Sequence, residues 1–159
     1  MSIRLIVVGK LKEKYLRQGV AEYQKRLQGY TKLKIEEVKD QPTKENSSEK
    51  EDEQLRMKEG EAILSKIKER DYVYLLDIEG KMLDSVQFAK HIEQRRIQGQ
   101  SQLVFVIGGS IGVSHAVKKR ANTTLSFGKM TYPHQLMRLI LTEQIYRAYR
   151  IINKQPYHK

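Results

Sequence analysis

The sequence predicts an α/β domain with a mainly parallel sheet and flanking helices. Short apolar runs rich in β-branched residues alternate with longer segments of helical periodicity, the pattern of strand–helix–strand units. The length of 159 residues is enough for one domain to bury a substantial core. With 39% hydrophobic and 31% charged residues, the chain has the composition of a soluble globular protein rather than a disordered one. We expect a single domain over residues 1–159.

The first third predicts a strand, a helix, an edge strand and a second helix. Ile3–Gly9 is a β-branched apolar run that ends in glycine, which is typical of a buried strand. Lys14–Gln28 is expected to be helical, and Leu33–Val38 alternates apolar and polar residues like an edge strand. Residues 40–47 form a loop, after which Ser48 and Glu51 make a capping box. The helix that they open is mostly polar and is expected to run to about residue 69.

The middle of the chain repeats this alternation. Tyr72–Ile78 is an apolar strand, followed by a turn over residues 79–81. Ser85–Gln98 is expected to be a helix with three inward residues, Val86, Ala89 and Ile92. Leu103–Ile107 is the most apolar run in the chain and predicts another buried strand.

The remaining elements are a short helix over Val113–Ala121, a strand over Thr123–Phe127 and a long helix over Pro133–Asn153. Pro133 suits the first turn of that helix. Ligands of parallel α/β sheets bind at the carboxyl ends of strands. We therefore expect the site among the loops that follow Ile78, Ile107 and Phe127.

The basic residues are concentrated towards the C-terminal end. The chain has 30 Lys and Arg against 19 Asp and Glu, a formal net charge of +11. Residues 1–60 carry +3, residues 61–110 carry 0, and residues 111–159 carry +8 with Glu143 as the only acid. One-sided positive charge on a folded domain favours a polyanionic partner, and nucleic acid fits better than a membrane surface. A basic surface that only maintains solubility is the alternative, but it leaves the asymmetry unexplained.

Several functional classes are excluded by residues that the chain lacks. It has no cysteine, which rules out disulfides, thiol nucleophiles and cysteine-based metal sites. Four scattered histidines give no metal motif, and we expect His91 and His115 to be surface residues. No apolar run is long enough to cross a bilayer, and the interrupted N-terminal run does not resemble a signal peptide. These observations favour a cytoplasmic protein.

Two loop segments carry candidate binding residues. Residues 107–112 (Ile-Gly-Gly-Ser-Ile-Gly) follow a buried strand but match neither a dinucleotide fingerprint nor a P-loop, so close approach to a ligand and a simple tight turn remain open. Residues 125–134 place a glycine, a methionine and an aromatic residue just before a proline. Such a segment could hold a flat heterocycle, or could simply pack in the core.

The last helix and the tail carry the catalytic candidates. The helix is apolar on more than one side, which indicates deep burial or a subunit contact. His134 and Arg138 lie four residues apart and share a face, where His134 could also be a cap or core residue and Arg138 could also be solvent-exposed. Glu143 and Arg147 are best interpreted as an i,i+4 salt bridge. Tyr157 and His158 could stack on an extruded base, although terminal residues are often disordered.

Five segments taken together carry a family resemblance. They are Val8–Lys12, the glycine segment Val106–Gly112, Leu125–Arg138 with its Pro-His-x-x-x-Arg motif, Glu143–Ala148, and the Pro-Tyr-His-Lys tail. The chain resembles the ribosomal RNA large subunit methyltransferase H family over essentially its whole length. The joint occurrence of the glycine segment, the Pro-His-x-x-x-Arg motif and the tail makes the resemblance specific.

The resemblance implies a fold, a reaction and an assembly. The fold is the SPOUT methyltransferase type with a C-terminal trefoil knot, in a homodimer. The reaction is transfer of a methyl group from S-adenosyl-L-methionine to N3 of a pseudouridine in 23S rRNA, within assembled 70S ribosomes and with no metal. No DNA or membrane partner is expected. The donor would be bound by Leu76, Gly108 and the segment Phe127, Gly128, Lys129, Met130, Thr131 and Tyr132.

The same resemblance leaves the catalytic roles open among four residues. The proton on pseudouridine N3 must leave, and imidazole is the usual general base near neutral pH, so His134 or His158 is expected to take it. Tyr157 could stack on or hydrogen-bond the base. Arg138 could hold a phosphate or stabilise a developing negative oxygen. The competing functions are a non-catalytic RNA-binding or ribosome-assembly module and, more weakly, a nucleotide-binding enzyme of flavodoxin-like topology.

Overall fold

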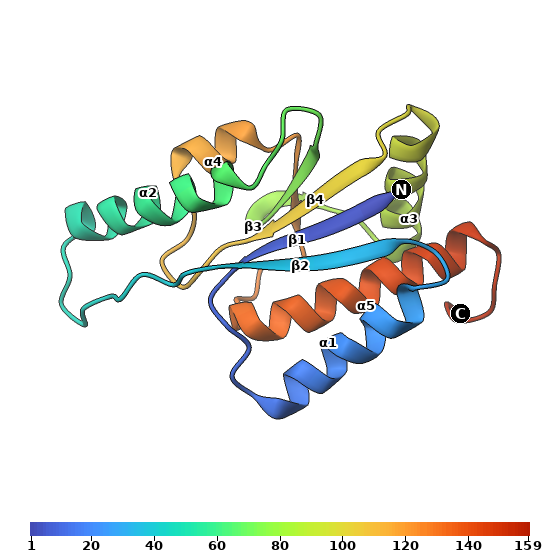
Figure 1. The fold of residues 1–159 in the computed structure, drawn as a ribbon, viewed down its shortest axis with the longest axis horizontal. Helices are drawn as coiled ribbons and strands as arrows, with labels where there is room; N and C mark the ends of the chain where they lie inside the picture. The colour runs from blue at the N-terminus through green and yellow to red at the C-terminus, as the bar shows by residue number, and fades with distance from the viewer.

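The computed structural model describes all residues 1–159 and has three layers, with helices on both faces of one sheet (Figure 1). The five strands lie in the order β2-β1-β4-β3-β5, and every neighbouring pair is parallel. This confirms the α/β class and the parallel sheet. The strands are β1 (Ser2–Val8), β2 (Lys32–Val38), β3 (Tyr72–Met82), β4 (Gln102–Ile107) and β5 (Thr123–Ser126). The helices are α1 (Lys14–Leu27), α2 (Glu49–Ser65), α3 (Ser85–Ile97), α4 (His115–Arg120) and α5 (His134–Ile152).

The two faces of the sheet bury separate hydrophobic clusters. Helices α1, α3 and α5 cover one face, and α2 and α4 cover the other (Figure 1). Side chains of a strand alternate between faces, so Ile3, Leu5 and Val7 of β1 join the first cluster. Ile6 and Val8 join the second. Burial on both faces explains why β1 from Leu5 onward and β4 from Leu103 onward are continuous apolar runs, whereas β2 is a half-exposed edge strand as predicted.

Strand β3 differs from the prediction at the expected turn over residues 79–81. The strand continues to Met82, and its pairing with β5 shifts register between Leu76 and Lys81. Gly80 explains how the irregular segment fits. A Cβ at this position would lie 2.7 Å from backbone atoms of Thr124 and Leu125, so only glycine allows the segment to pass this close to β5.

The starts of α2 and α3 are set by capping boxes, whereas the end of α2 was not correctly predicted from the sequence. The capping box of Ser48 and Glu51 is present, but α2 ends at Ser65 rather than near residue 69. The chain then turns through a short loop into β3. Helix α3 begins with a second capping box, between Asp84 and Gln87. In α3 the buried residues are Phe88, Ala89 and Ile92, and the prediction that Val86 points inward is wrong because it is exposed.

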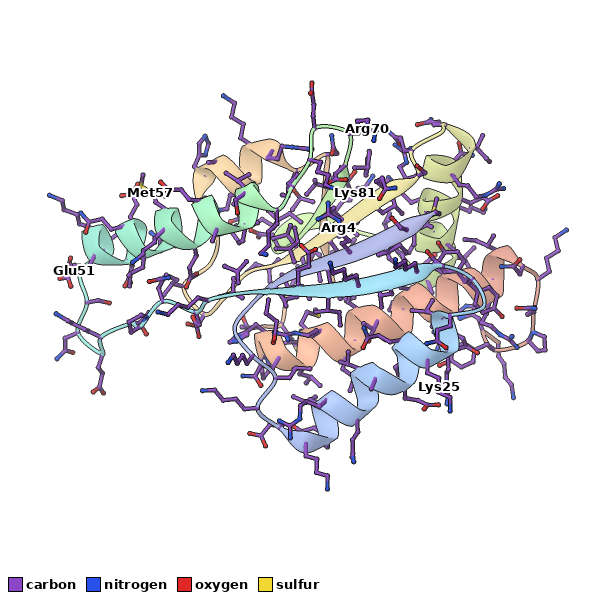
Figure 2. The ribbon with its side chains drawn as sticks, viewed as in Figure 1. Arg4, Lys25, Glu51, Met57, Arg70 and Lys81 are labelled. Carbon is purple, nitrogen blue, oxygen red and sulfur yellow. The ribbon has the colours of Figure 1, made fainter.

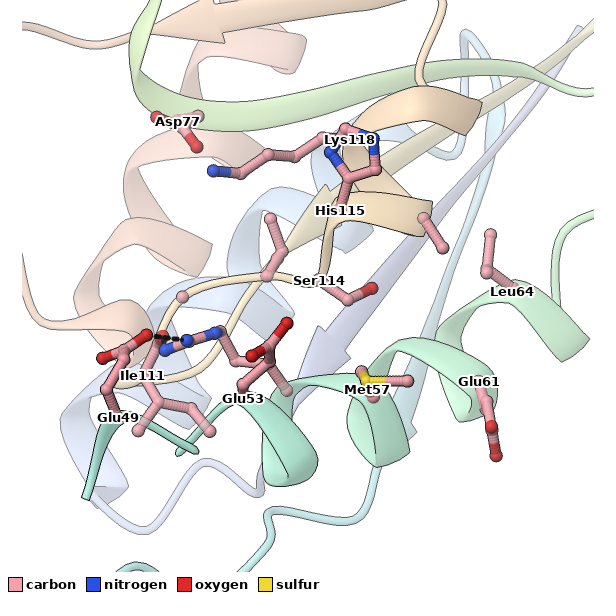
Figure 3. Close-up of a pocket in the computed structure, with 14 residues that line it drawn as sticks. Glu49, Glu53, Met57, Glu61, Leu64, Asp77, Ile111, Ser114, His115 and Lys118 are labelled. Carbon is pink, nitrogen blue, oxygen red and sulfur yellow. Dashed lines mark hydrogen bonds and ion pairs between the residues drawn. The ribbon is translucent and has the colours of Figure 1, made fainter. Parts of the chain in front are cut away.

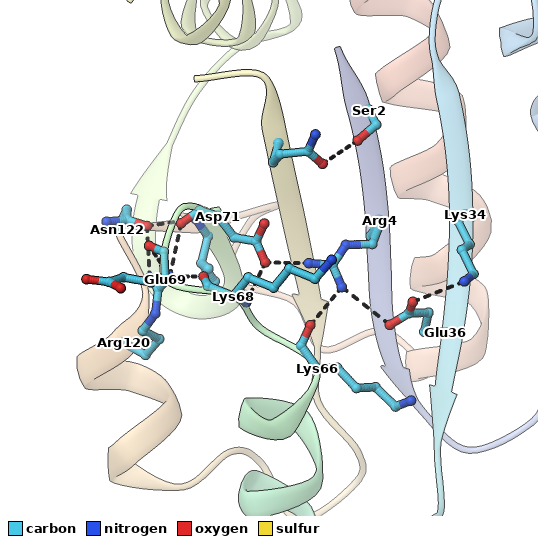
Figure 4. A network of polar contacts seen from close by, with 12 residues as sticks. Ser2, Arg4, Lys34, Glu36, Lys66, Lys68, Glu69, Asp71, Arg120 and Asn122 are labelled. Carbon is cyan, nitrogen blue, oxygen red and sulfur yellow. Dashed lines mark hydrogen bonds and ion pairs between the residues drawn. The ribbon is translucent and has the colours of Figure 1, made fainter. Parts of the chain in front are cut away.

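A polar network fixes the amino end of β1 to the loop that follows α2 (Figure 4). The guanidinium of Arg4 pairs with Asp71, donates to the Lys66 carbonyl at 2.7 Å and contacts Glu36 at 3.5 Å. Asp71 also accepts from the amide of Lys68 at 2.7 Å. The Asp71 side chain is almost fully buried, so the ion pair has little contact with water. This network lies at the end of the sheet opposite the expected site.

Most other charged side chains project outward from the helices (Figure 2). Lys25 on α1 and Glu51 on α2 are exposed examples. His91 differs from the expected surface residue, because it is half-buried and its Nδ1 lies 2.8 Å from the hydroxyl of Tyr74. Burial lowers the pKa of His91, and the nearby Arg95 and Lys81 lower it further. His115 is exposed as expected.

Candidate active site

The three loops named by the sequence meet in one cleft of about 360 Å³ at the carboxyl ends of the strands. The walls come from the end of β3, from the glycine segment after β4, and from the segment between β5 and α5. About half of the lining residues are hydrophobic, and the start of α5 contributes His134 and Met137. A cleft of this kind suits a ligand with a flat apolar part and several polar groups.

Seven of the eight predicted donor-binding residues line this cleft. They are Leu76, Gly108, Phe127, Gly128, Met130, Thr131 and Tyr132. Lys129 is exposed and lies outside the lining. Met130 and Tyr132 are 75% and 40% exposed, which leaves apolar surface at the mouth. The donor-binding roles themselves stay predictions.

At the back of the cleft, the space beside Gly108 is too small for a side chain. A Cβ on this residue would lie 2.6 Å from Cγ1 of Val113, well inside normal contact distance. The loop that turns back through Gly112 can therefore bring the Val113 side chain this close to the end of β4 because position 108 has no side chain. The result is a wall of main chain, which offers its N–H and C=O groups to a ligand.

His134 and Arg138 lie together beside the end of β1, as their spacing predicted. His134 lines the cleft, and its Nε2 lies 3.8 Å from the point that a Cβ on Gly9 would occupy. Arg138 is 1% exposed and donates to the Gly9 carbonyl and to Glu37, both at 3.1 Å. Burial lowers the pKa of Arg138, although pairing with Glu37 opposes this. In this chain Arg138 ties α5 to the ends of β1 and β2.

The C-terminal tail folds back along α5. The Tyr157 hydroxyl donates to Glu143 at 3.3 Å, and Arg147 stacks over the Tyr157 ring at 4.6 Å. Arg147 also forms the predicted salt bridge with Glu143, at 2.7 Å. Burial raises the pKa of Tyr157, and Tyr23 and Glu143 add to this effect. Tyr157 is therefore protonated at neutral pH, and can donate a hydrogen bond but not accept a proton from a substrate.

His158 reaches the opposite side of residues 127–132, the predicted donor loop. It lines a second cleft of about 580 Å³, which shares Leu125, Phe127 and Gly128 with the first. Its Nδ1 lies 3.2 Å from a guanidinium nitrogen of Arg147. The structure thus places His134 and His158 on two sides of the segment after β5. Arg138 lies one helical turn after His134, and Tyr157 of the tail packs against α5 next to His158.

The sequence did not single out several lining residues. Asp77, Val113 and Met137 border the first cleft. The signal that could have found Asp77 and Val113 is position, because Asp77 lies in the second half of β3 and Val113 follows the glycine segment after β4. No group of three or more His, Asp or Glu side chains lies close enough to hold a metal ion. No helix is both long and apolar enough to span a membrane.

Comparisons with known proteins decide the family. The family model described as "Predicted SPOUT methyltransferase" matches residues 1–158. The chain belongs to the SPOUT methyltransferase family. This confirms the family resemblance found in the sequence.

Several relatives of this SPOUT protein align over their full length. "Ribosomal RNA large subunit methyltransferase H" of Enterococcus faecalis is 55% identical over 159 residues, which is 100% of both chains. The proteins of the same name from Limosilactobacillus reuteri and Carboxydothermus hydrogenoformans are 56% and 54% identical, also over 100% of both chains. Identity at this level over the whole chain leaves no segment of the site without a counterpart in the relatives.

A solved structure supports the SPOUT fold. A probable methylase family protein from Haemophilus influenzae matches with a TM-score of 0.50 at 10% identity. The match covers 96% of this chain and 66% of that one. At this identity the likeness concerns the fold alone.

Proposed function

We propose that this chain transfers a methyl group from S-adenosyl-L-methionine to N3 of a pseudouridine in 23S rRNA, within assembled ribosomes. The observation that carries the proposal is the cleft in which seven predicted donor-binding residues meet beside His134. The names of the full-length relatives support the class of substrate.

The cleft fits the chemical parts of such a donor. Its apolar side chains, among them Leu76, Leu125 and Phe127, suit the faces of an adenine ring. The main-chain wall at Gly108–Gly109 suits the polar edges of a nucleoside. Asp77 adds a carboxylate that would attract the positive charge of a sulfonium or an ammonium group. When bound, the donor supplies an electrophilic methyl group that needs no metal.

The chain's own residues must orient the base and take one proton. In-line transfer is accelerated chiefly by alignment of the two reactants. The base N3 carries a proton that has to leave, and the two histidines on either side of the donor loop are the candidates to accept it. Tyr157 stays protonated and so serves as a hydrogen-bond donor or a stacking surface. Arg138 is bound to Glu37 and to Gly9, which favours a role in holding His134 and β1 together.

The basic surface fits an RNA partner. Residues 111–159, which contain half of the cleft and the whole tail, carry a net charge of +8. Phosphate contacts of this kind give affinity without sequence information. A single small domain therefore gains its specificity from the shape of an assembled ribosome. That substrate would place the protein in the cytoplasm.

A homodimer and a trefoil knot belong to the same proposal. Leu136 and Ile140 on α5 are only half-buried in one chain, which supports a subunit contact along this helix. A second copy would also bring another tail near the donor loop. Membership of the SPOUT family supports the trefoil knot.

A transfer assay tests the reaction. Purified protein is incubated with 70S ribosomes that lack the modification and with labelled S-adenosyl-L-methionine, and the label is mapped by digestion and mass spectrometry. We expect one methyl group on a pseudouridine of 23S rRNA. Label on another nucleotide would refute the assigned position. Ribosome binding without any transfer would support the RNA-binding module instead.

A second assay separates the tail from the donor site. A chain truncated after Gln155 should bind the donor with unchanged affinity but transfer no methyl group, because Tyr157 and His158 do not line the first cleft. Sedimentation of the full chain at micromolar concentration should show a dimer. A truncated chain that loses donor affinity would contradict the role given to the tail.

A further inference from the structure

Helix α2 contacts the glycine loop, residues 108–112, and Ser114 just after it. Figure 3 shows the pocket that Ile111 and Ser114 line together with Met57 of α2. Arg56 donates to the Ile111 carbonyl at 3.2 Å and also pairs with Glu49. Gly60 packs against Ser114, where a Cβ on Gly60 would lie 2.3 Å from the hydroxyl oxygen. Between these two contacts, Glu59 reaches under Gly109. The loop therefore rests on α2, although α2 contributes no residue to the lining of the first cleft.

Glu59 is an unusual residue in this position. It is 2% exposed, and its Oε2 accepts a hydrogen bond from the Gln41 amide at 2.9 Å. Its Oε1 is buried without a hydrogen-bond partner. A Cβ on Gly109 would lie 3.5 Å from this oxygen and 3.1 Å from Cγ1 of Val8. A buried carboxyl without a cationic partner is costly, so its presence calls for a role other than stability.

Asp40 supplies the missing partner if Glu59 carries a proton. Asp40 directly precedes Gln41, whose amide binds Glu59, so the two carboxyl groups lie near each other and Asp40 could accept a hydrogen bond from the protonated acid. Burial raises the pKa of Glu59, Asp40 adds to this, and the Gln41 amide acts in the opposite direction. Asp40 in turn lies beside Gly9, where Cβ and Oδ2 are each 3.8 Å from the point that a Gly9 Cβ would occupy. His134 Nε2 lies at the same distance from that point.

We propose that Glu59 is a positioning residue for methyl transfer: its buried carboxyl, bonded to the Gln41 amide, holds the glycine loop at Gly109 against the end of β1 and so fixes one wall of the proposed donor cleft. The inference rests on the proposed function, because it assigns the first cleft to the donor. Glu59 touches neither reactant. It acts through the main chain of Gly109, which lines the cleft beside Ser110.

Two substitutions at position 59 separate this role from simple packing. Glu59→Leu keeps the size of the side chain but leaves the Gln41 amide without its acceptor and Asp40 without its donor. We expect donor affinity to fall about tenfold, the order of effect of one unsatisfied buried group, with no change in KM for ribosomes. Glu59→Gln restores affinity, because its amide can accept from Gln41 and donate to Asp40 in the place of the protonated acid.

The measurements are calorimetric titration of the full-length protein with S-adenosyl-L-methionine, steady-state methyl transfer to ribosomes, and thermal unfolding. Glu61→Leu is the matched control, since Glu61 is an exposed glutamate on the same helix. Asp71→Asn is the second control, because Asp71 is a buried carboxyl at the far end of the sheet. Both should retain wild-type donor affinity, even where Asp71→Asn lowers Tm.

Three results would overturn the proposal. They are wild-type donor affinity in Glu59→Leu, a loss in Glu59→Gln as large as in Glu59→Leu, and an equal loss in Asp71→Asn. If Glu59→Leu does not fold, Asp40→Leu removes the partner at an exposed position. It should weaken donor binding in the same direction, and wild-type affinity there would also count against the proposal. A wild-type chain that binds no donor would instead refute the proposed function.

Discussion

Replacement of Gly108 by alanine tests the main-chain wall of the donor cleft. Gly108 does not adopt the left-handed backbone region that disfavours alanine, so the backbone itself tolerates the change. The new Cβ would meet Cγ1 of Val113 at 2.6 Å, whereas carbon atoms pack best at about 3.5–4.0 Å. Valine cannot easily rotate away, because its χ1 is restricted. The overlap must then move the glycine loop.

The magnitude follows from the cost of overpacking. We expect Gly108→Ala to lower the free energy of unfolding by about 2 kcal/mol. Val113→Ala alone should cost about 1 kcal/mol, because Val113 is half-buried. The double variant should also cost only about 1 kcal/mol, since the truncated side chain makes room for the new Cβ. Donor affinity should fall in Gly108→Ala and recover in the double variant.

Urea unfolding followed by far-UV circular dichroism measures these energies, because the chain has no tryptophan for fluorescence. All four chains of the cycle must be compared under the same conditions. Additive losses, with the double variant near 3 kcal/mol, would refute the reasoning. They would show that position 108 excludes a side chain for some cause other than Val113.

Three further predictions concern the fold. Gly80→Ala should lower the free energy of unfolding by about 3 kcal/mol, because the new Cβ meets the backbone of β5. Truncation of side chains on β5 should not restore this stability, and restoration would disprove the explanation. Asp71→Leu should cost about 3 kcal/mol, because it removes the buried carboxylate that pairs with Arg4 and accepts from the Lys68 amide; Arg4→Met in the same chain should recover part of the loss, which a double-mutant cycle in urea checks. Burial lowers the pKa of His91 in the folded protein. Its neutral form therefore contributes stability that is present above the ordinary pKa of 6.5 and is lost as the pH falls below that value. His91→Gln should flatten this part of a curve of Tm against pH, and an unchanged slope would argue against burial as the cause.

The sequence predicted the elements well where one local signal dominates. Apolar β-branched runs located β1 and β4, and the capping box at Ser48 located the start of α2. The end of α2 was misplaced by about four residues, because a polar helix has no periodic stripe whose end can be seen. The expected turn at Gly80 was wrong because the glycine serves a close contact with β5, which only the tertiary structure creates.

In the candidate site, too, local sequence signals predicted some features, whereas others depend on tertiary contacts. The rule that ligands bind at the carboxyl ends of parallel strands identified the three loops that meet in the cleft. The spacing of His134 and Arg138 correctly predicted that they share one face of the helix. It did not predict that Arg138 is buried against Glu37. Glu59 gave no signal at all, because one glutamate among many on a polar helix cannot be distinguished until the loop is seen to rest on it. The catalytic assignments of Tyr157 and His158 stay predictions.

The strand order has a consequence for how the protein is made. Strand β1 pairs with β4, about one hundred residues later in the chain, and β5 joins the edge of β3 last. Parallel pairings over such separations form slowly, because a large loop must close before any contact is gained. During synthesis, β1 and β2 lack their neighbour β4 until residue 107 has been made. The proposed donor loop, residues 127–132, is synthesised later still. If the proposed function holds, a donor molecule would stabilise the finished protein but would give no help to a growing chain, which must reach this arrangement unaided.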